Sequence, residues 1–140
     1  MDELDLSHLL LDAFRSLDRE IATALEDRGA GELRPSQAVA LLQVERTGTR
    51  LSELAQRAGI TKQAMMQLVD DLQGMGCVRR VPDPQDSRAK IVRLTARGLR
   101  LRASARKAIQ AVESRIRRRL GGRRYEGLRG LLVELKEVEE

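Results

Sequence analysis

The stretch ITKQAMMQLVDDLQGMGCVRRVPDPQDSRAKI, residues 60–91, decides how this chain folds. In its first half apolar residues recur at three- and four-residue steps, which predicts a helix over residues 61–74. Thr61 suits the cap of this helix, and Gly74 and Gly76 can end it. Its second half, continued to Leu94, contains two β-prone segments, 77–81 and 90–94, separated by the turn-forming PDPQDSRA. The stretch therefore predicts a helix followed by a β-hairpin.

The residues before this stretch predict three further helices, over 5–28, 33–47 and 52–59. Residues 49–51 are expected to form a short strand. Ser52 is expected to cap the third helix and Gly59 to end it. Two helices joined by a short turn that contains glycine form a helix-turn-helix, so residues 52–74 fit that motif.

The residues after the hairpin predict a long helix from the Thr95 cap to Leu120 and a last helix over 123–139. These helices and the first one have apolar stripes that a small central module cannot cover, which predicts packing against a second copy of the chain. We expect a mainly α fold with a small β-wing in a single domain over 1–140. Its parts are helices for dimerisation in 1–31 and 99–140 and a winged helix-turn-helix in 32–98.

Composition excludes several classes of function. Cys77 and His8 are the only residues of their types, so a disulfide within the chain is excluded and no metal or cofactor is expected. Aromatic residues are 1% of the chain, which argues against base stacking as a way to hold nucleic acid. The sequence lacks an apolar run of the roughly 18 residues that span a membrane, and its acidic beginning, MDELDLSHLL, is unlike a signal peptide. A cytoplasmic protein without a membrane partner is expected.

Positive charge is concentrated in the second half of the chain. The net charge is +5, from 26 basic and 21 acidic residues. Between Arg79 and Arg124 the acidic residues are only Asp83, Asp86 and Glu113, whereas the first helix is acidic. This asymmetry indicates a surface for a polyanion. An arginine-rich, solvated helix face is the alternative interpretation.

The helix over 61–74 has an outward face that suits double-stranded DNA. Lys62, Gln63 and Gln67 can donate to base edges or phosphates, and Met66 can contact a thymine methyl group. An ordinary amphipathic surface helix is the alternative. At the hairpin tip, Arg88 can enter a narrow minor groove, with Asp86 bracing its guanidinium. The alternative there is a surface salt bridge worth about 0–1 kcal/mol.

Three stretches resemble the MarR family of winged helix-turn-helix transcriptional regulators. They are LRPSQAVALL, LSELAQRAGITKQAMMQLVDDLQGMGCVRR and DPQDSRAKIVRLTARG. The resemblance implies a homodimeric repressor that binds a palindromic operator, with the recognition helix, residues 61–74, in the major groove and the wing, residues 82–90, at the minor groove. It also implies release by a small anionic or aromatic effector, with a regulator insensitive to ligands as the alternative.

The resemblance also implies residue roles. The positions that correspond to DNA contacts are Ser52, Thr61, Lys62, Gln63, Ala64, Met66, Gln67, Asp86, Arg88 and Lys90. An anionic effector would be bound by arginines near the first, second and fifth helices, for which the candidates are Arg15, Arg19, Arg46 and Arg97.

The chain departs from the family pattern at three positions. Gln67 and Asp71 stand where the family commonly has basic residues, which predicts either an altered base preference or greater dependence on Arg88, Arg79 and Arg80. Cys77 replaces a bulky residue, and a small buried hydrophobe is the expected role, with redox sensing as the alternative.

Two other classes of function remain as alternatives. A protein-interaction or sensory module of the same fold would not bind DNA specifically. An enzyme is not expected, because the sequence offers no catalytic set; His8 is expected at an interface or in solvent.

Overall fold

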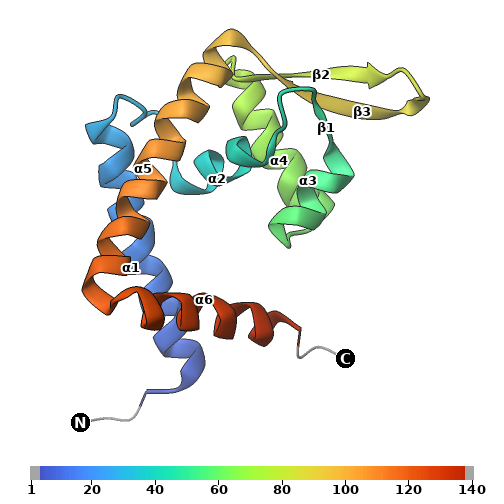
Figure 1. Ribbon diagram of the computed structural model, residues 1–140. Coiled ribbons are helices and arrows are strands. Elements are labelled where there is room, and N and C mark those ends of the chain that lie inside the picture. The colour runs from blue at the N-terminus through green and yellow to red at the C-terminus, as the bar shows by residue number, and fades with distance from the viewer. Residues whose placement is uncertain (1–3, 138–140) are drawn as a thin grey trace.

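The computed structural model describes residues 4–137, which form a mainly helical fold with a small antiparallel sheet. The elements, in chain order, are α1 (Leu6–Asp27), α2 (Pro35–Gln43), β1 (Thr49–Arg50), α3 (Leu51–Ala58), α4 (Lys62–Gly74), β2 (Val78–Asp83), β3 (Asp86–Leu94), α5 (Ala96–Leu120) and α6 (Gly122–Lys136). Figure 1 shows α1 beside α5, with α6 crossing the far end of this pair and the smaller elements grouped at the other end.

One hydrophobic core joins α1 to the smaller elements. Its fully buried side chains come from every part of the chain between α1 and α5, and the largest are Leu25, Leu41, Leu54, Met65, Leu72, Val44, Val69, Val78, Val92 and Val112. Leucine, valine and methionine supply this core in place of aromatic residues, because close-packed helices and a short sheet leave spaces that branched aliphatic side chains fill.

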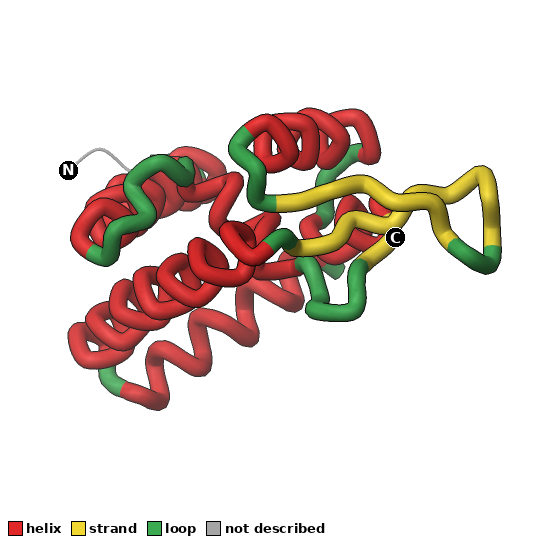
Figure 2. Tube along the Cα trace, turned by 90° about the horizontal axis from the view of Figure 1, so that it is seen from above, coloured by secondary structure: helices red, strands yellow, loops and turns green. Residues whose placement is uncertain are grey.

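The sheet has the strand order β1-β3-β2, and both pairings are antiparallel. The β2–β3 hairpin runs from the Val78–Leu94 pair to the Asp83–Asp86 pair at its tip. Figure 2 shows this hairpin projecting away from the helices. The expected wing is therefore present, and one end of it is free of the core.

The predicted caps of α4 and α5 are confirmed. The hydroxyl oxygen of Thr61 accepts a hydrogen bond from the Ala64 N–H at 3.1 Å, and that of Thr95 accepts one from the Gly98 N–H at 3.0 Å. Gly59 has a φ of 66°, a left-handed conformation that ends α3 and that other residues rarely adopt. These local signals set where α4 and α5 begin.

The predicted end of the second helix, Thr47, is wrong, because α2 ends at Gln43. Val44 turns to an extended conformation and is buried, with 1% of its surface exposed. The Glu45 N–H then donates to the hydroxyl of Thr49 at 2.9 Å instead of continuing the helix. A threonine side chain offers the backbone an alternative partner, which here starts the turn into β1.

The predicted cap of the third helix is also wrong. Arg50 occupies the cap position and Ser52 lies within the first turn of α3, which begins at Leu51. The strand β1 is confined to Thr49–Arg50 for the same reason, since its pairing with Val92 and Ile91 leads directly into the helix. Ser52 is exposed.

The hairpin turn is much tighter than the loop predicted over residues 82–89. The turn consists of Pro84 and Gln85, and Arg88 lies inside β3. The Asp83 carboxylate accepts a hydrogen bond from the Gln85 N–H at 2.9 Å, which closes the turn. Pro82 is tolerated because β2 is an edge strand.

The two ends of the chain expose large apolar side chains. Leu6 and Phe14 of α1 are 61% and 60% exposed, and Leu131 of α6 is 65% exposed. α6 ends at Lys136, so the predicted last residues of its helix, Val138 and Glu139, lie outside the described residues. Within residues 4–137 of one copy, these apolar side chains stay exposed.

Candidate nucleic-acid interface

The α3–α4 pair presents one face of α4 to solvent. Met65, Val69 and Leu72 anchor α4 in the core. The opposite face is therefore exposed, as expected for the predicted reading positions Lys62, Gln63, Ala64, Met66 and Gln67. The Thr61 cap satisfies one backbone N–H at the start of α4 and leaves that end pointing outward.

A groove of about 260 Å³ lies between the start of α3, the start of α4 and the wing. It brings together the predicted residues Ser52, Lys62, Met66, Arg88 and Lys90, which come from three separate elements. Three of these side chains are cationic at neutral pH, so the groove has a positive potential that favours a polyanion. The groove lining does not include Thr61, Gln63, Ala64, Gln67 or Asp86.

Arg50 is a groove residue that the sequence did not single out. Its guanidinium lies 2.5 Å from the carboxylate of Asp83, which is 6% exposed. The Gln85 N–H, and then Arg50, hold the pKa of Asp83 below its usual range against the opposing effect of burial. No local signal marks Arg50, because its position depends on the pairing of β1 with β3.

The predicted bracing of Arg88 by Asp86 takes a different form. The Asp86 carboxylate accepts a hydrogen bond from the backbone N–H of Arg88 at 3.0 Å, instead of pairing with its guanidinium. Arg88 is exposed and was predicted at the tip of the hairpin. It lies two residues after the start of β3, in the stretch between Asp86 and Lys90 where the pairing with β2 is irregular. Asp86 thus shapes the backbone and leaves the Arg88 guanidinium free of that carboxylate.

Both aspartates on α4 have basic partners. Asp71 accepts hydrogen bonds from Gln67 at 3.1 Å and from Arg34 at 3.2 Å. Asp70 pairs with Arg80 at 2.6 Å, and Arg80 also donates to Gln73 at 3.1 Å. The negative charge of α4 is therefore balanced within the protein, and the guanidinium of Arg80 is engaged with α4.

The four arginines expected to bind an anionic effector do not line a common site. Arg97 pairs with Glu32, and Arg19 lines a polar hollow to which α1 contributes Glu20 and α5 contributes Arg115. Arg15 is exposed, and Arg46 lies in the turn after α2. These four arginines therefore do not converge on one site within a single copy of the chain, and their role toward an effector stays a prediction.

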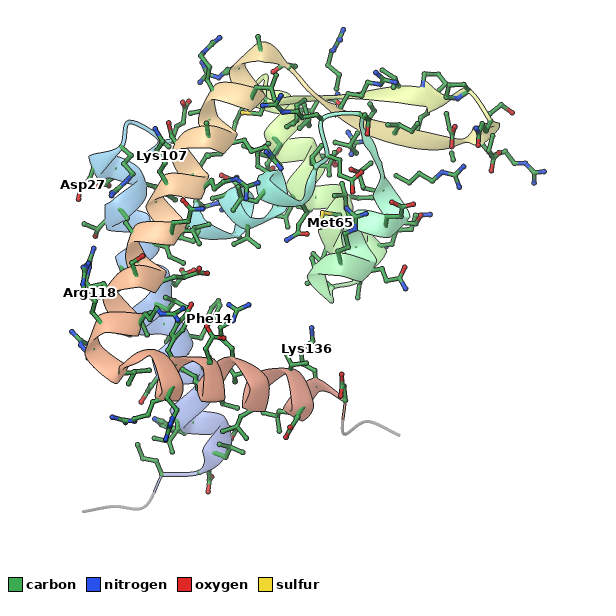
Figure 3. All side chains as sticks on the ribbon, viewed as in Figure 1. Phe14, Asp27, Met65, Lys107, Arg118 and Lys136 are labelled. Atoms are coloured by element: carbon green, nitrogen blue, oxygen red, sulfur yellow. The ribbon has the colours of Figure 1, made fainter. Side chains whose placement is uncertain are left out.

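An apolar cavity of about 340 Å³ lies elsewhere, between α1, α2 and α4. Its walls include Phe14 and Leu17 of α1, Val39 of α2, and Met65 and Leu68 of α4. Figure 3 shows Phe14 on the side of α1 that faces the part of the chain containing Met65. Helical periodicity predicts the positions of these residues on their helices, but it does not show that their side chains leave a space.

Cys77 is fully buried, with 0% of its surface exposed. Burial raises the pKa of the Cys77 thiol, and the nearby Arg97 only partly opposes this effect. Since the thiolate is the reactive form, this environment favours the packing role over redox sensing.

No helix among residues 4–137 is both long and apolar enough to cross a membrane.

Comparisons with known proteins agree with this geometry. Residues 32–89 match a model of the MarR family. The chain is 29% identical over 135 residues to the HTH-type transcriptional repressor Rv2887 of Mycobacterium tuberculosis, covering 96% of this chain and 95% of that protein. It is similar to the solved structure of the transcriptional repressor CouR bound to a 23-mer DNA duplex, with 25% identity, 96% and 99% of the two chains covered, and a TM-score of 0.81. A complex of Staphylococcus aureus MepR with DNA shares the fold, at 19% identity, 96% and 98% coverage and a TM-score of 0.83.

Proposed function

This chain belongs to the MarR family of transcriptional regulators, and from that premise we propose that it is a homodimeric repressor of a palindromic DNA operator. α4 enters the major groove and the wing reaches the adjacent minor groove. The family consists of regulators, and we propose no catalytic role for this member. As a regulator bound to the chromosome it acts in the cytoplasm.

The observation that supports DNA binding is the groove between α4 and the wing. Lys62 comes from the recognition helix, and Arg88 and Lys90 come from β3, yet all three line one groove. Cations that converge on a projecting surface bind the phosphate backbone and the electronegative minor groove. The CouR relative that is solved in complex with DNA has the same overall fold, with a TM-score of 0.81.

The roles of the reading residues follow from their positions on α4. Lys62 and Gln63 lie in the first turn, where the N-terminal end of α4 also favours a phosphate. Met66 and Gln67 lie one turn further along, where they meet base edges. Ser52, at the start of α3, contacts the sugar-phosphate backbone of the DNA. Asp86 accepts a hydrogen bond from the main-chain N–H of Arg88 and thereby helps to position Arg88 in the wing.

The terminal helices support a dimer. Large apolar side chains of α1 and α6 remain exposed in one copy, and a second copy is the simplest way to bury them. We assign residues 1–31 and 99–140 to dimerisation and 32–98 to DNA binding. Two recognition helices held at a fixed distance match two half-sites of a palindrome.

The apolar cavity is the proposed site of a small-molecule effector that releases the repressor from DNA. Met65 and Leu68 belong to the recognition helix and also line the cavity. A ligand that prefers one position of α4 shifts the protein toward that position and changes its affinity for DNA.

DNA binding is tested by selecting duplexes from a randomised pool with the full-length chain and measuring affinity by fluorescence anisotropy. We expect a palindromic consensus, binding at least about a thousandfold tighter than to random DNA, and a steep loss of affinity with salt. Failure to enrich any sequence would contradict specific DNA binding. A stable dimer without DNA affinity would instead favour a protein-interaction module.

A further inference from the structure

The apolar cavity behind the recognition helix contains one charged side chain, and that side chain is acidic. Asp18 of α1 joins a lining that otherwise consists of apolar residues and Ser36. Asp18 is half-buried, and within residues 4–137 no cationic side chain lies within 4.0 Å of its carboxylate. The cavity thus combines apolar walls with an unpaired negative charge.

An anionic ligand does not suit this cavity. A carboxylate placed inside would meet the Asp18 charge and would lose hydration without gaining a cationic partner. Arg15, Arg19, Arg46 and Arg97 are absent from its lining, and Arg97 is already paired with Glu32. The chemistry of the lining favours a compound with an apolar body and a positive charge.

We propose that this cavity binds a hydrophobic amine, whose ammonium group pairs with Asp18 while its apolar body contacts Phe14, Leu17 and Met65. The volume of about 340 Å³ is within the range of small-molecule sites. This inference rests on the proposed function only in its regulatory part; binding of the amine itself is independent of DNA.

The cavity is connected to DNA binding through the recognition helix. Met65 is 0% exposed and Leu68 is half-buried, whereas Lys62 and Gln63 of the same helix are exposed. Ile60, in the turn before α4, also lines the cavity. An amine between α1 and α4 therefore acts on the back of the same helix that meets the bases, and it lowers the affinity for DNA. By linkage, DNA lowers the affinity for the amine by the same factor.

The test uses three compounds with one apolar body: phenylbutylamine, phenylbutanol and phenylbutyrate. Their dissociation constants for the full-length protein are measured by isothermal titration calorimetry at neutral pH. We expect phenylbutylamine to bind at least about fivefold more tightly than phenylbutyrate, with phenylbutanol between them, as an ion pair in a partly desolvated site requires. Equal binding of the three compounds, tighter binding of phenylbutyrate, or no binding of any would overturn the proposal.

Two variants distinguish the effect of the Asp18 charge from the effect of the cavity volume. Asp18→Asn should remove the preference for the amine and leave phenylbutanol binding unchanged, whereas Asp12→Asn on the same helix, outside the cavity lining, should keep the preference. Val39→Phe should block all three compounds, because Val39 lines the cavity and is 41% exposed, so that a larger side chain there leaves the core intact. An amine preference that survives in Asp18→Asn would refute the role of Asp18.

The regulatory part is measured separately, as the change in affinity for the selected duplex at saturating phenylbutylamine. A loss of DNA affinity in the wild type that is absent in Asp18→Asn supports the proposal. Amine binding without any change in DNA affinity refutes the coupling. A protein that binds the amine but no DNA refutes the proposed function and leaves the amine site standing.

Discussion

The guanidinium of Arg50 lies 2.5 Å from the carboxylate of Asp83, an ion pair that joins the residue before α3 to the tip of the hairpin. Arg50 also lines the groove that contains Lys62 and Arg88. The pair therefore links the tip of the wing to the helix-turn-helix.

Asp83 should make the stability of the protein depend on pH in the acid range. Its pKa lies below the ordinary value of 3.8, chiefly because the Gln85 N–H favours the charged carboxylate. A group with a lowered folded pKa adds stability above its unfolded pKa, and this contribution is lost as the pH falls through the folded pKa. We expect the Tm difference between wild type and Asp83→Asn to be constant above about pH 5 and to shrink below 3.8. Thermal melts followed by circular dichroism measure it.

The Gln85→Ala variant is the matched control for Asp83→Asn. It retains the backbone N–H that Asp83 accepts from, so its melts should follow the wild-type pH dependence. A Tm difference between wild type and Asp83→Asn that grows on acidification would contradict a lowered pKa of Asp83 in the folded protein.

Gly98 should not tolerate a side chain. A Cβ atom at Gly98 would lie 1.9 Å from the carbonyl oxygen of Cys77, a backbone atom that cannot rotate away. We expect Gly98→Ala to lower the free energy of unfolding by about 1–3 kcal/mol or more, as overpacking does. Chemical denaturation measures this change.

Gly74→Ala is the control for the Gly98 prediction. Gly74 is also helical, but nothing lies within 4 Å of its added Cβ. This substitution should be neutral or stabilise α4 by up to about 1 kcal/mol, from helix propensity. Equal effects of the two alanines would show that the Cys77 contact is unimportant.

Arg88 should contribute directly to DNA affinity. Its guanidinium is exposed and is not paired with Asp86, so it is available to the minor groove. We expect Arg88→Ala to weaken binding to the selected operator by about 1–3 kcal/mol and to reduce the salt slope by about 1. Arg118→Ala, on the far part of α5 in Figure 3, should change neither quantity. An unchanged affinity for DNA in Arg88→Ala would show that Arg88 makes no contribution to DNA binding.

Asp71 should restrain the reading of bases by Gln67. Its carboxylate accepts from the Gln67 amide at 3.1 Å, which fixes the amide orientation, and it also lowers the local positive potential. We expect Asp71→Ala to raise affinity for random DNA by about 0.2–1 kcal/mol and to reduce the preference for the selected operator. Asp70→Ala, which frees Arg80 but leaves Gln67 restrained, should raise the affinity without the loss of preference. Anisotropy titrations with both duplexes distinguish the two effects.

Leu131 should lie in the dimer interface. It is the most exposed large apolar residue of the described chain, at 65%. We expect Leu131→Asp to raise the dimer dissociation constant by at least about tenfold, because a buried carboxylate would lack a partner. Arg129→Asp, on the other side of α6, is the control for added negative charge. Sedimentation velocity over a range of concentrations measures the dimer dissociation constant. An unchanged constant in Leu131→Asp would show that this face of α6 lies outside the dimer interface.

The helical part of the fold could be predicted closely from local patterns. Thr61 and Thr95 cap their helices as expected, and the turn at Gly59 has the left-handed backbone that glycine favours. The second helix was predicted too long, because the competition of the Thr49 hydroxyl for the Glu45 N–H depends on a turn four residues later. Because each helix cap is a contact between residues close in sequence, it can be predicted from a local sequence pattern.

The candidate site could be predicted only in part. Ser52, Lys62, Met66, Arg88 and Lys90 do meet in one groove, but the sequence did not indicate that Arg50 joins them. The outward direction of residues on α4 follows from helical periodicity. The convergence of side chains from β1, α4 and β3 depends on strand pairing and on packing angles, which periodicity does not contain.

By itself the sequence determined the order and type of the elements, the face of α4 that is buried, and the family resemblance, because each depends on residues within a few positions of one another. Only the tertiary structure decided that Arg88 lies within a strand, that Arg50 braces Asp83, and that Asp18 is the lone charge in an apolar cavity. Those relationships join residues that are distant in sequence, and their energies depend on burial and geometry that arise only when the helices and the sheet pack together.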